Sequence, residues 1–370
     1  MDLATRAIHH PARRIDGAIV PPIQLSTTFE HGPANESLCD HEYIRDGNPN
    51  VDDLQTRLTS IENAAGSVVF SSGMAAGVAV LQSLDPGSRI LFHDGIYFDF
   101  ADLAENKLSH WGLEVERVDF SDQEAFQTAI DRKPSLVWFE SPTNPLLTVL
   151  DIEAISKAAH SVGAKVLVDS TFAPPAIQRP LDSGADFVLH SLTKYMGGHS
   201  DIQGGSISFA KQAECFESLV HIRRLTGGVL SPFNAWMVSR GIQTLDCRME
   251  RHCANAYAIA SMLDTHPKID RVRYPFLESD PGYGIAKKQM SAGGGMISVD
   301  VRGGRKAAID VASKVKLFRN ATSLGGVESL IEHRASVEGP DSQTPASLLR
   351  MSIGLESATD LIADLEQALG

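Results

Sequence analysis

Short apolar runs alternate with amphipathic segments through the middle of the chain. Polar or turn-forming residues bound each apolar run, as is usual for buried strands. We expect strands at residues 67–70, 89–92, 115–118, 136–140, 165–170, 186–189 and 205–209. Most of the segments between them repeat apolar positions at helical spacing, over residues 71–84, 98–110, 122–131 and 152–162. The alternation predicts an α/β fold with a mostly parallel, seven-stranded sheet that helices cover on both faces.

The pattern changes on both sides of this region. After residue 234 we expect helices at 235–263, 307–315 and 358–369 and strands at 295–300 and 348–353, which together form a smaller α+β domain. Up to about residue 50 we expect no core element, and a helix follows over 51–63. An arm without its own core usually packs on another subunit or domain. The sequence predicts an arm at 1–55, a large domain at 56–234 and a C-terminal domain at 235–370.

Composition and charge restrict the possible partners. The 370 residues carry 33 Lys and Arg against 46 Asp and Glu, a net charge of −13 that disfavours nucleic acid and anionic lipid. The first residues lack the apolar centre of a secretory signal, and no apolar run could cross a bilayer, so we expect a cytoplasmic protein. Neither the four cysteines nor the histidines have metal-ligand spacing, and no metal site is predicted.

The most informative stretch runs from His190 to Asp201. It follows a predicted strand and brings together Ser191, Thr193 and Lys194. Residues just after a strand lie at the carboxyl edge of the sheet, where α/β folds bind ligands. A lysine beside hydroxyls suggests an imine-forming amine next to a phosphorylated cofactor. The alternative is a surface lysine in a Gly-rich turn.

Other strand ends carry matching groups. Residues 71–77 join a strand to a helix through small residues, which favours an anion site at the helix N-terminus, although close packing also explains them. Asp169 could pair with a protonated pyridine nitrogen, and Asn144 could bind a ring hydroxyl. For Asp169 alone, a helix N-cap is the alternative.

Ordered motifs along almost the whole chain resemble the cystathionine γ-synthase, γ-lyase and β-lyase family of pyridoxal-phosphate (PLP) enzymes. The motifs are Tyr43-x-Arg45 with Asn48-Pro49, Ser72-Gly-Met74, Tyr97, Glu140-Ser-Pro-Thr-Asn-Pro145, Val168-Asp169, Ser191-Leu-Thr-Lys-Tyr-Met-Gly-Gly-His199, Ser323-Leu-Gly-Gly-Val-Glu-Ser329 and Arg350-Met-Ser-Ile-Gly354. The resemblance implies fold type I of the PLP enzymes, which is like that of aspartate aminotransferase. It also implies a homodimer of dimers, that is, a homotetramer.

The resemblance also implies roles for particular residues. Lys194 would hold PLP through an imine and move protons, and Tyr97 would stack on the ring and act in proton transfer as a phenolate. Asp169 and Asn144 would bind the ring. The phosphate would lie on the backbone of Gly73 and Met74, on the hydroxyls of Ser191 and Thr193, and on Tyr43 and Arg45 of a neighbouring subunit. Arg350 would bind the substrate α-carboxylate, with Ser323 and Asn144 nearby.

The implied activity is γ-elimination or γ-replacement on sulfur amino acids or homoserine esters, like that of cystathionine γ-synthase or γ-lyase. Methionine γ-lyase, O-acylhomoserine sulfhydrylase and cystathionine β-lyase are alternatives within the family. A catalytically silent PLP-binding protein and an aminotransferase on the same fold are alternatives from other classes. A silent protein would not need Lys194, Asp169, Tyr97 and Arg350 together.

The chain departs from the family pattern around the substrate side. γ-Type relatives commonly have an acid where this chain has Thr322, and residues 331–336 lack a Met-Thr-His element. We therefore hypothesise that Asp99 or Glu332 supplies a carboxylate for a distal ammonium group of the substrate. The alternative is that both are solvated surface acids.

Overall fold

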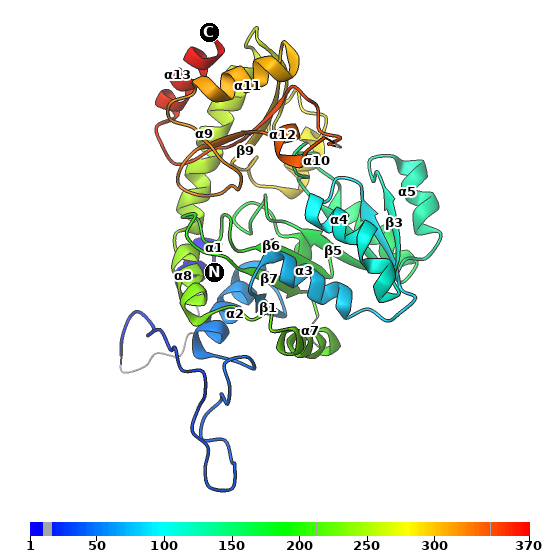
Figure 1. The fold of residues 1–370 in the computed structure, drawn as a ribbon, viewed down its shortest axis with the longest axis vertical. Coiled ribbons are helices and arrows are strands. Elements are labelled where there is room, and N and C mark those ends of the chain that lie inside the picture. The colour runs from blue at the N-terminus through cyan, green and yellow to red at the C-terminus, as the bar shows by residue number, and fades with distance from the viewer. Residues whose placement is uncertain (10–16, 212, 341) are drawn as a thin grey trace.

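The computed structural model describes residues 1–9, 17–211, 213–340 and 342–370. A large seven-stranded sheet occupies the middle of the molecule, and a five-stranded sheet with its helices lies above it (Figure 1). In spatial order, the large sheet contains β1 (Gly66–Phe70), β7 (Gly205–Phe209), β6 (Phe187–Ser191), β5 (Lys165–Asp169), β4 (Leu136–Glu140), β2 (Arg89–His93) and β3 (Glu114–Val118). All neighbouring pairs from β6 to β3 are parallel, whereas β7 runs antiparallel to both β1 and β6.

Both faces of the large sheet are buried. Successive side chains of a strand point to opposite faces, and successive side chains of β4 and β5 are buried. In β4, Trp138 packs on one face with residues of α3 and α4, while Val137 and Phe139 pack on the other face with α6. The helices that accompany this sheet are α2 (Pro49–Glu62), α3 (Gly73–Gln82), α4 (Phe98–Asn106), α5 (Gln123–Ile130), α6 (Ile152–Ser161) and α7 (Ala213–Thr226). The sheet therefore has the continuous apolar strands typical of a covered α/β core.

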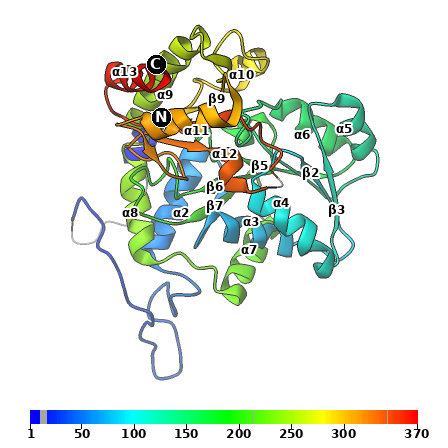
Figure 2. The ribbon, with the colours of Figure 1, turned by 45° about the horizontal axis from the view of Figure 1, so that its top comes forward.

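The C-terminal part forms a second core around its own sheet. The strand order is β10 (Arg319–Asn320), β11 (Leu330–His333), β12 (Leu348–Ser352), β9 (Met296–Val301) and β8 (Ile269–Arg273). Its helices are α9 (Leu245–Asp264), α10 (Tyr283–Gln289), α11 (Gly304–Lys314), α12 (Arg334–Glu338) and α13 (Ala358–Leu369). Figure 2 shows α12 at the junction between this part and the large sheet. The α/β fold with a smaller α+β part is confirmed.

The prediction of a single helix over residues 235–263 is wrong. The segment forms two helices, α8 (Pro232–Ile242) and α9, with Gln243 and Thr244 between them. A Cβ on Gly241 would lie 2.4 Å from the Gly197 carbonyl oxygen, so the end of α8 packs directly on the backbone after Lys194. The helix expected over 98–110 likewise ends at Asn106, and a 3-10 turn follows at Leu108–Trp111.

The N-terminal region contains one core element that the pattern did not predict. The short helix α1 (Leu3–Ile8) buries Leu3 and Ala7 in the cluster that includes α2 and α9. From residue 17 to 48 the described chain forms two isolated bridges and extends away from the body (Figure 1). The boundaries proposed at residues 55 and 234 both fall inside helices, α2 and α8.

Candidate functional site

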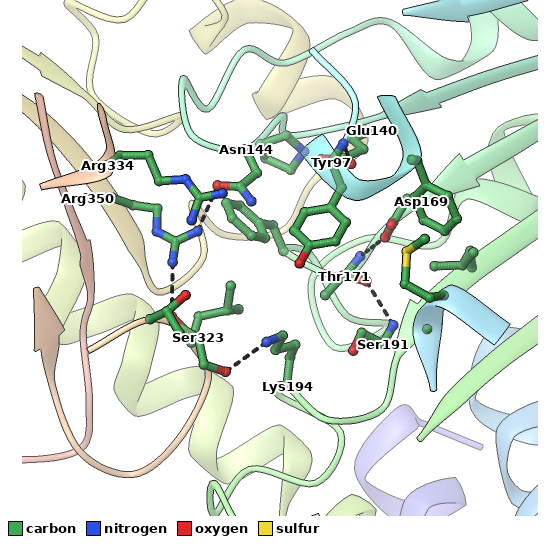
Figure 3. Close-up of a pocket in the computed structure, with 18 residues that line it drawn as sticks. Tyr97, Glu140, Asn144, Asp169, Thr171, Ser191, Lys194, Ser323, Arg334 and Arg350 are labelled. Carbon is green, nitrogen blue, oxygen red and sulfur yellow. Dashed lines mark hydrogen bonds between the residues drawn. The ribbon is translucent and has the colours of Figure 1, made fainter. Parts of the chain in front are cut away.

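A cavity lies at the carboxyl ends of β4, β5 and β6, facing the C-terminal part (Figure 3). It holds about 700 Å³ of empty space, part of which opens to solvent, a size suited to a small ligand. The predicted site residues that line it are Gly73, Met74, Tyr97, Asn144, Asp169, Ser191, Lys194, Ser323 and Arg350. The sheet end, the start of α3 and the C-terminal part thus contribute to one cavity.

Three predicted residues do not line this cavity. Thr193 Oγ1 donates to the Gly204 carbonyl at 3.3 Å and accepts from the Gly204 N–H at 3.2 Å. Tyr43 and Arg45 lie on the projecting N-terminal region, and Arg45 Nη1 donates to the carbonyl of Arg224 at 3.1 Å. Their expected contacts with the phosphate involve a neighbouring subunit, so these remain a proposal.

Lys194 is the amine of the cavity. Its Nζ donates to Ser323 Oγ at 2.7 Å. Burial, with the Arg350 guanidinium second, lowers the pKa of Lys194 to about 8. Ser323 has a φ of 87°, which is unusual for a residue other than glycine, and its carbonyl accepts from Arg350 Nη2 at 3.2 Å. The lowered pKa increases the neutral fraction of the amine near neutral pH, and the neutral amine is the form that attacks an aldehyde.

Two buried carboxylates end neighbouring strands of the site. Glu140 and Asp169 occupy the same register position on β4 and β5. Burial is the largest factor that raises the pKa of each carboxyl, and their mutual repulsion raises that of Glu140 further. Neither forms an ion pair with another described residue. A protonated pyridine nitrogen next to Asp169 would supply the missing positive charge, so this pair fits PLP.

The N-terminus of α3 forms a compact anion cradle. Ser72 caps the helix by accepting from the Ala75 N–H at 3.0 Å, and the first-turn N–H groups have no acceptor within a helix. Two glycines bring the backbone close to neighbouring segments here. A Cβ on Gly205 would lie 2.1 Å from the Ser72 carbonyl oxygen, and one on Gly73 would lie 3.1 Å from the Cβ of Ser191. A phosphate fits beside these N–H groups and the Ser191 hydroxyl.

Arg350 extends from β12 into the other side of the cavity. Its Nη1 donates to Asn144 Oδ1 at 2.8 Å, and it forms an ion pair with Glu332. Burial lowers the pKa of Arg350 to about 10, which leaves it charged at neutral pH. A charged, planar guanidinium at this position is suited to a substrate carboxylate.

The hypothesis of a distal carboxylate from Glu332 is wrong. Glu332 is 2% exposed, lies outside the cavity lining, and pairs with both Arg334 and Arg350. Asp99 also lies outside the lining, and its carboxylate lies close enough to the Tyr97 hydroxyl to affect the pKa of that group. Burial first, and the nearby Asp99 carboxylate second, raise the pKa of Tyr97 to about 12, so the protein alone favours the neutral phenol over the expected phenolate.

Two charged residues of the site were given no role by sequence reasoning. Glu140 lies in a quoted motif, but only its register with Asp169 reveals it as a site carboxylate. Arg334 also lines the cavity and lies in the segment where the chain departs from the family pattern. Among the residues the structure describes, no group of His, Cys, Asp and Glu could hold a metal ion, and no helix is long and apolar enough to cross a membrane.

Comparisons with known proteins identify the family of the chain. The family model described as "Cys/Met metabolism PLP-dependent enzyme" matches residues 4–370. The cystathionine gamma-synthase of Mycobacterium tuberculosis (strain ATCC 25618 / H37Rv) is 44% identical, and the alignment covers 99% of this chain and 96% of the relative. The L-methionine gamma-lyase of Pseudomonas putida is 38% identical with the same coverage of both chains.

Solved structures give the same result. The structure of metB from Corynebacterium glutamicum superposes with a TM-score of 0.96 at 42% identity, covering 100% of this chain and 98% of that one. A cystathionine gamma synthase from Xanthomonas oryzae pv. oryzae, in complex with aminoacrylate and cysteine, has a TM-score of 0.95 at 38% identity and the same coverage. The family, fold and cofactor expected from the motifs are confirmed. The chain belongs to the Cys/Met metabolism PLP-dependent enzymes and is a PLP enzyme of sulfur-amino-acid trans-sulfuration.

Proposed function

We propose that the enzyme catalyses γ-replacement on an O-acylated homoserine with cysteine, as a cystathionine γ-synthase. The observation that carries this proposal is the contact of Lys194 Nζ with Ser323 Oγ. The backbone carbonyl of the same Ser323 accepts a hydrogen bond from Arg350. A lysine beside the α-carboxylate site can reach the protons on both Cα and Cβ, and γ-chemistry needs both. Mycobacterial relatives at 42–44% identity named cystathionine gamma-synthase support replacement over elimination.

We further propose the roles of the surrounding residues. Bound PLP withdraws electrons from Cα of an attached amino acid and makes its proton acidic. Lys194 takes the Cα proton, and its neutral fraction near pH 8 suits it to accept protons in turn. Asp169 keeps the ring nitrogen protonated, and Asn144 orients the ring while it holds Arg350. Tyr97 covers the ring as a neutral phenol in the resting site.

The phosphate site completes the proposed arrangement. We assign the phosphate to the N–H groups of Gly73 and Met74, with the hydroxyls of Ser191 and Thr193 nearby. Tyr43 and Arg45 reach it from a neighbouring subunit of a cytoplasmic homotetramer. The exposed apolar side chains of the projecting region support an intersubunit contact, since Ile19, Val20, Leu25 and Leu38 are each more than half exposed in the single chain.

The test is an assay of products with purified enzyme and PLP. O-Succinylhomoserine with cysteine is expected to give cystathionine and succinate in equal amounts. Methionine would give methanethiol if the chain were a methionine γ-lyase, an alternative that the 38% identical relatives favour. Cystathionine would give cysteine in γ-elimination and homocysteine in β-elimination. Faster turnover of methionine or cystathionine than of the ester would contradict the proposal.

A further inference from the structure

Lys194 and Arg350 come from different sheets but act on one substrate in the proposed function. Lys194 follows β6 of the large sheet, and Arg350 lies on β12 of the C-terminal sheet. Ser323 contacts both side chains, but the distance between the two residues also depends on how their backbone segments are held. A misplacement of reacting groups by about 1 Å can slow a reaction about a hundredfold, so an element that holds both segments affects the rate.

One face of α9 carries buried polar side chains that reach both segments. Arg248, His252 and Asn255 are four and three residues apart along the helix, so they lie on the same side of it. All three are buried, and each donates to a backbone carbonyl of a segment next to the site. Figure 1 shows α9 as a long helix that starts next to α8 and continues into the C-terminal part.

Arg248 holds the segment that carries Lys194. Its Nη1 donates to the carbonyl of Tyr195, the residue after Lys194, and its Nη2 donates to the carbonyl of Gly241, each at 2.7 Å. Its Nε donates to Thr244 Oγ1 at 3.2 Å, so these acceptors are all neutral oxygens. Burial lowers the pKa of Arg248 to about 10, which leaves the side chain charged at neutral pH. A charge is costly to bury, and here the planar guanidinium fixes two carbonyls relative to each other.

His252 holds the segment that carries Arg350. Its Nδ1 donates to the carbonyl of Ile353, three residues after Arg350, at 2.6 Å. Burial lowers the pKa of His252 to about 4, so the ring is neutral at pH 7 and its proton lies on Nδ1. Asn255 Nδ2 supports the same segment by donating to the carbonyl of Gly354 at 3.0 Å.

We propose that Arg248 and His252 are positioning residues through which α9 sets the distance between the Lys194 amine and the Arg350 guanidinium. Arg248 acts through the backbone next to Lys194, and therefore on proton transfer. His252 acts through the backbone after Arg350, and therefore on binding of the substrate carboxylate. About 6 Å of helix axis separates the Cα atoms of the two positioning residues, a spacing that one helix keeps constant. The inference rests on the roles that the proposed function gives to Lys194 and Arg350.

The experiment follows the exchange of the Cα proton of L-alanine in heavy water, a reaction that needs both roles but no leaving group. The Cα–H bond breaks, Lys194 accepts the proton and exchanges it with solvent, and a deuteron returns to Cα. NMR with the holoenzyme gives the rate at saturation and the alanine concentration that gives half this rate. Arg248→Lys is expected to lower the saturating rate about tenfold and to leave the half-saturating concentration nearly unchanged. His252→Phe is expected to raise that concentration about tenfold, with less effect on the rate.

A second readout does not depend on turnover. The pH midpoint of PLP uptake by the apoprotein reports the Lys194 amine, whose pKa is lowered mainly by burial. This midpoint is expected to rise in Arg248→Lys, because a loosened segment lets water reach the amine, and to keep the wild-type value in His252→Phe. His252→Asn retains a donor near the place of Nδ1 and is expected to restore most of the affinity for alanine.

The test remains decisive if Arg248→Lys does not fold. Thr244→Val removes the acceptor of Arg248 Nε at an exposed position, and is expected to lower the saturating rate in the same direction by less. Leu263→Val is the matched control, because Leu263 is buried in the C-terminal core near the far end of α9. It is expected to lower the urea midpoint without changing either exchange value.

The failures are distinguishable. If Arg248→Lys and His252→Phe only lower the urea midpoint, as Leu263→Val does, or if each changes rate and affinity alike, the inference is overturned. It is also overturned if the wild type exchanges no alanine proton, because the role of Lys194 then fails. If the wild type exchanges the proton with the expected effects of the variants but forms no cystathionine from an ester and cysteine, the proposed γ-replacement is wrong and this inference stands.

Discussion

Glu332 lies directly opposite Arg350 on the neighbouring strands β11 and β12, and the two buried side chains form an ion pair. Arg350 is therefore held on one side by a carboxylate and on the other by Asn144 and the Ser323 carbonyl. Because its partners fix the guanidinium before substrate arrives, little side-chain entropy remains to be lost on binding.

Removal of the Glu332 charge tests this arrangement. Glu332→Gln leaves two buried guanidinium groups without their shared anion, so the free energy of unfolding is expected to fall by about 3 kcal/mol. Urea denaturation measures the change. Asp270→Asn breaks the exposed pair with Arg302 and is the matched control, expected to cost less than about 1 kcal/mol. Equal losses in both variants would contradict the buried role of Glu332.

The lowered pKa of Lys194 predicts how cofactor uptake depends on pH. The neutral amine is the nucleophile, so the rate at which the apoprotein gains a visible absorption band with PLP is expected to rise with a midpoint near pH 8. Ser323→Ala removes the acceptor that stabilises the ammonium form and should move the midpoint to lower pH. Lys194→Ala should show no band that borohydride bleaches. A wild-type midpoint near that of an exposed lysine would exclude the buried amine.

The paired carboxylates Glu140 and Asp169 predict a pH-dependent stability of the apoprotein. Because folding raises the pKa of Glu140, the folded state binds more protons than the unfolded chain, and stability falls as pH rises through the raised value. Glu140→Gln should flatten this fall and stabilise the apoprotein at pH 7 relative to wild type. Urea midpoints at pH 5, 6, 7 and 8 measure it, with the exposed Glu366→Gln as control. If the urea midpoints of Glu140→Gln and wild type fall equally as pH rises, the expectation is contradicted.

The close approach of β7 to the start of α3 predicts an effect of Gly205→Ala. The added Cβ would meet the Ser72 backbone, which cannot move as a side chain can, so stability should fall by about 1–3 kcal/mol. The affinity for PLP should fall as well, since the displaced segment carries the anion cradle. Gly284→Ala has open space and a helical position, and should be neutral or slightly stabilising. PLP titration of both apoproteins measures the difference.

The proposed sharing of Arg45 between subunits can be tested by complementation. Arg45→Ala and Lys194→Ala should each be nearly inactive alone. If Arg45 serves the site of a neighbour, co-expression produces hybrids in which one site has both native residues, and about a quarter of wild-type activity should return. Steady-state kinetics of the mixed and separate proteins measure this. No recovery in verified hybrids would place Arg45 and Lys194 in the same chain's site.

Much of the cofactor-binding part of the site could be predicted, because its residues lie at or just after the ends of strands that the apolar pattern reveals. Asp169 and Ser191 end apolar runs, Lys194 follows closely, and the carboxyl ends of parallel strands meet at one edge. The antiparallel direction of β7 could not be predicted, because side chains alternate in the same way whichever direction a strand runs. The role of Glu140 likewise depends on its register with Asp169 rather than on its neighbours in sequence.

The substrate side was harder to predict. The expected distal acid, Glu332, instead forms ion pairs with Arg334 and Arg350. These arginines become its neighbours only when β11 pairs with β12 and α12 turns back. The helix break before α9 depends on Gly241 packing on the loop of residues 192–204 that contains Lys194, here called the lysine loop. This is a contact between segments that are distant in sequence. The helix α1 is too short for periodicity to reveal and gains its stability from packing.

Arg248 joins the lysine loop to the helix break, since its Nη1 and Nη2 donate to the carbonyls of Tyr195 and Gly241, each at 2.7 Å. The same helix, α9, packs its first half in the cluster that it shares with α2 and α8, through Met249, and its second half in the C-terminal core, through Ile259. A crossover within α9 would separate residues that pack in two different cores. Exchange of either part as a module with that of a relative is therefore expected to disturb one core or the lysine loop.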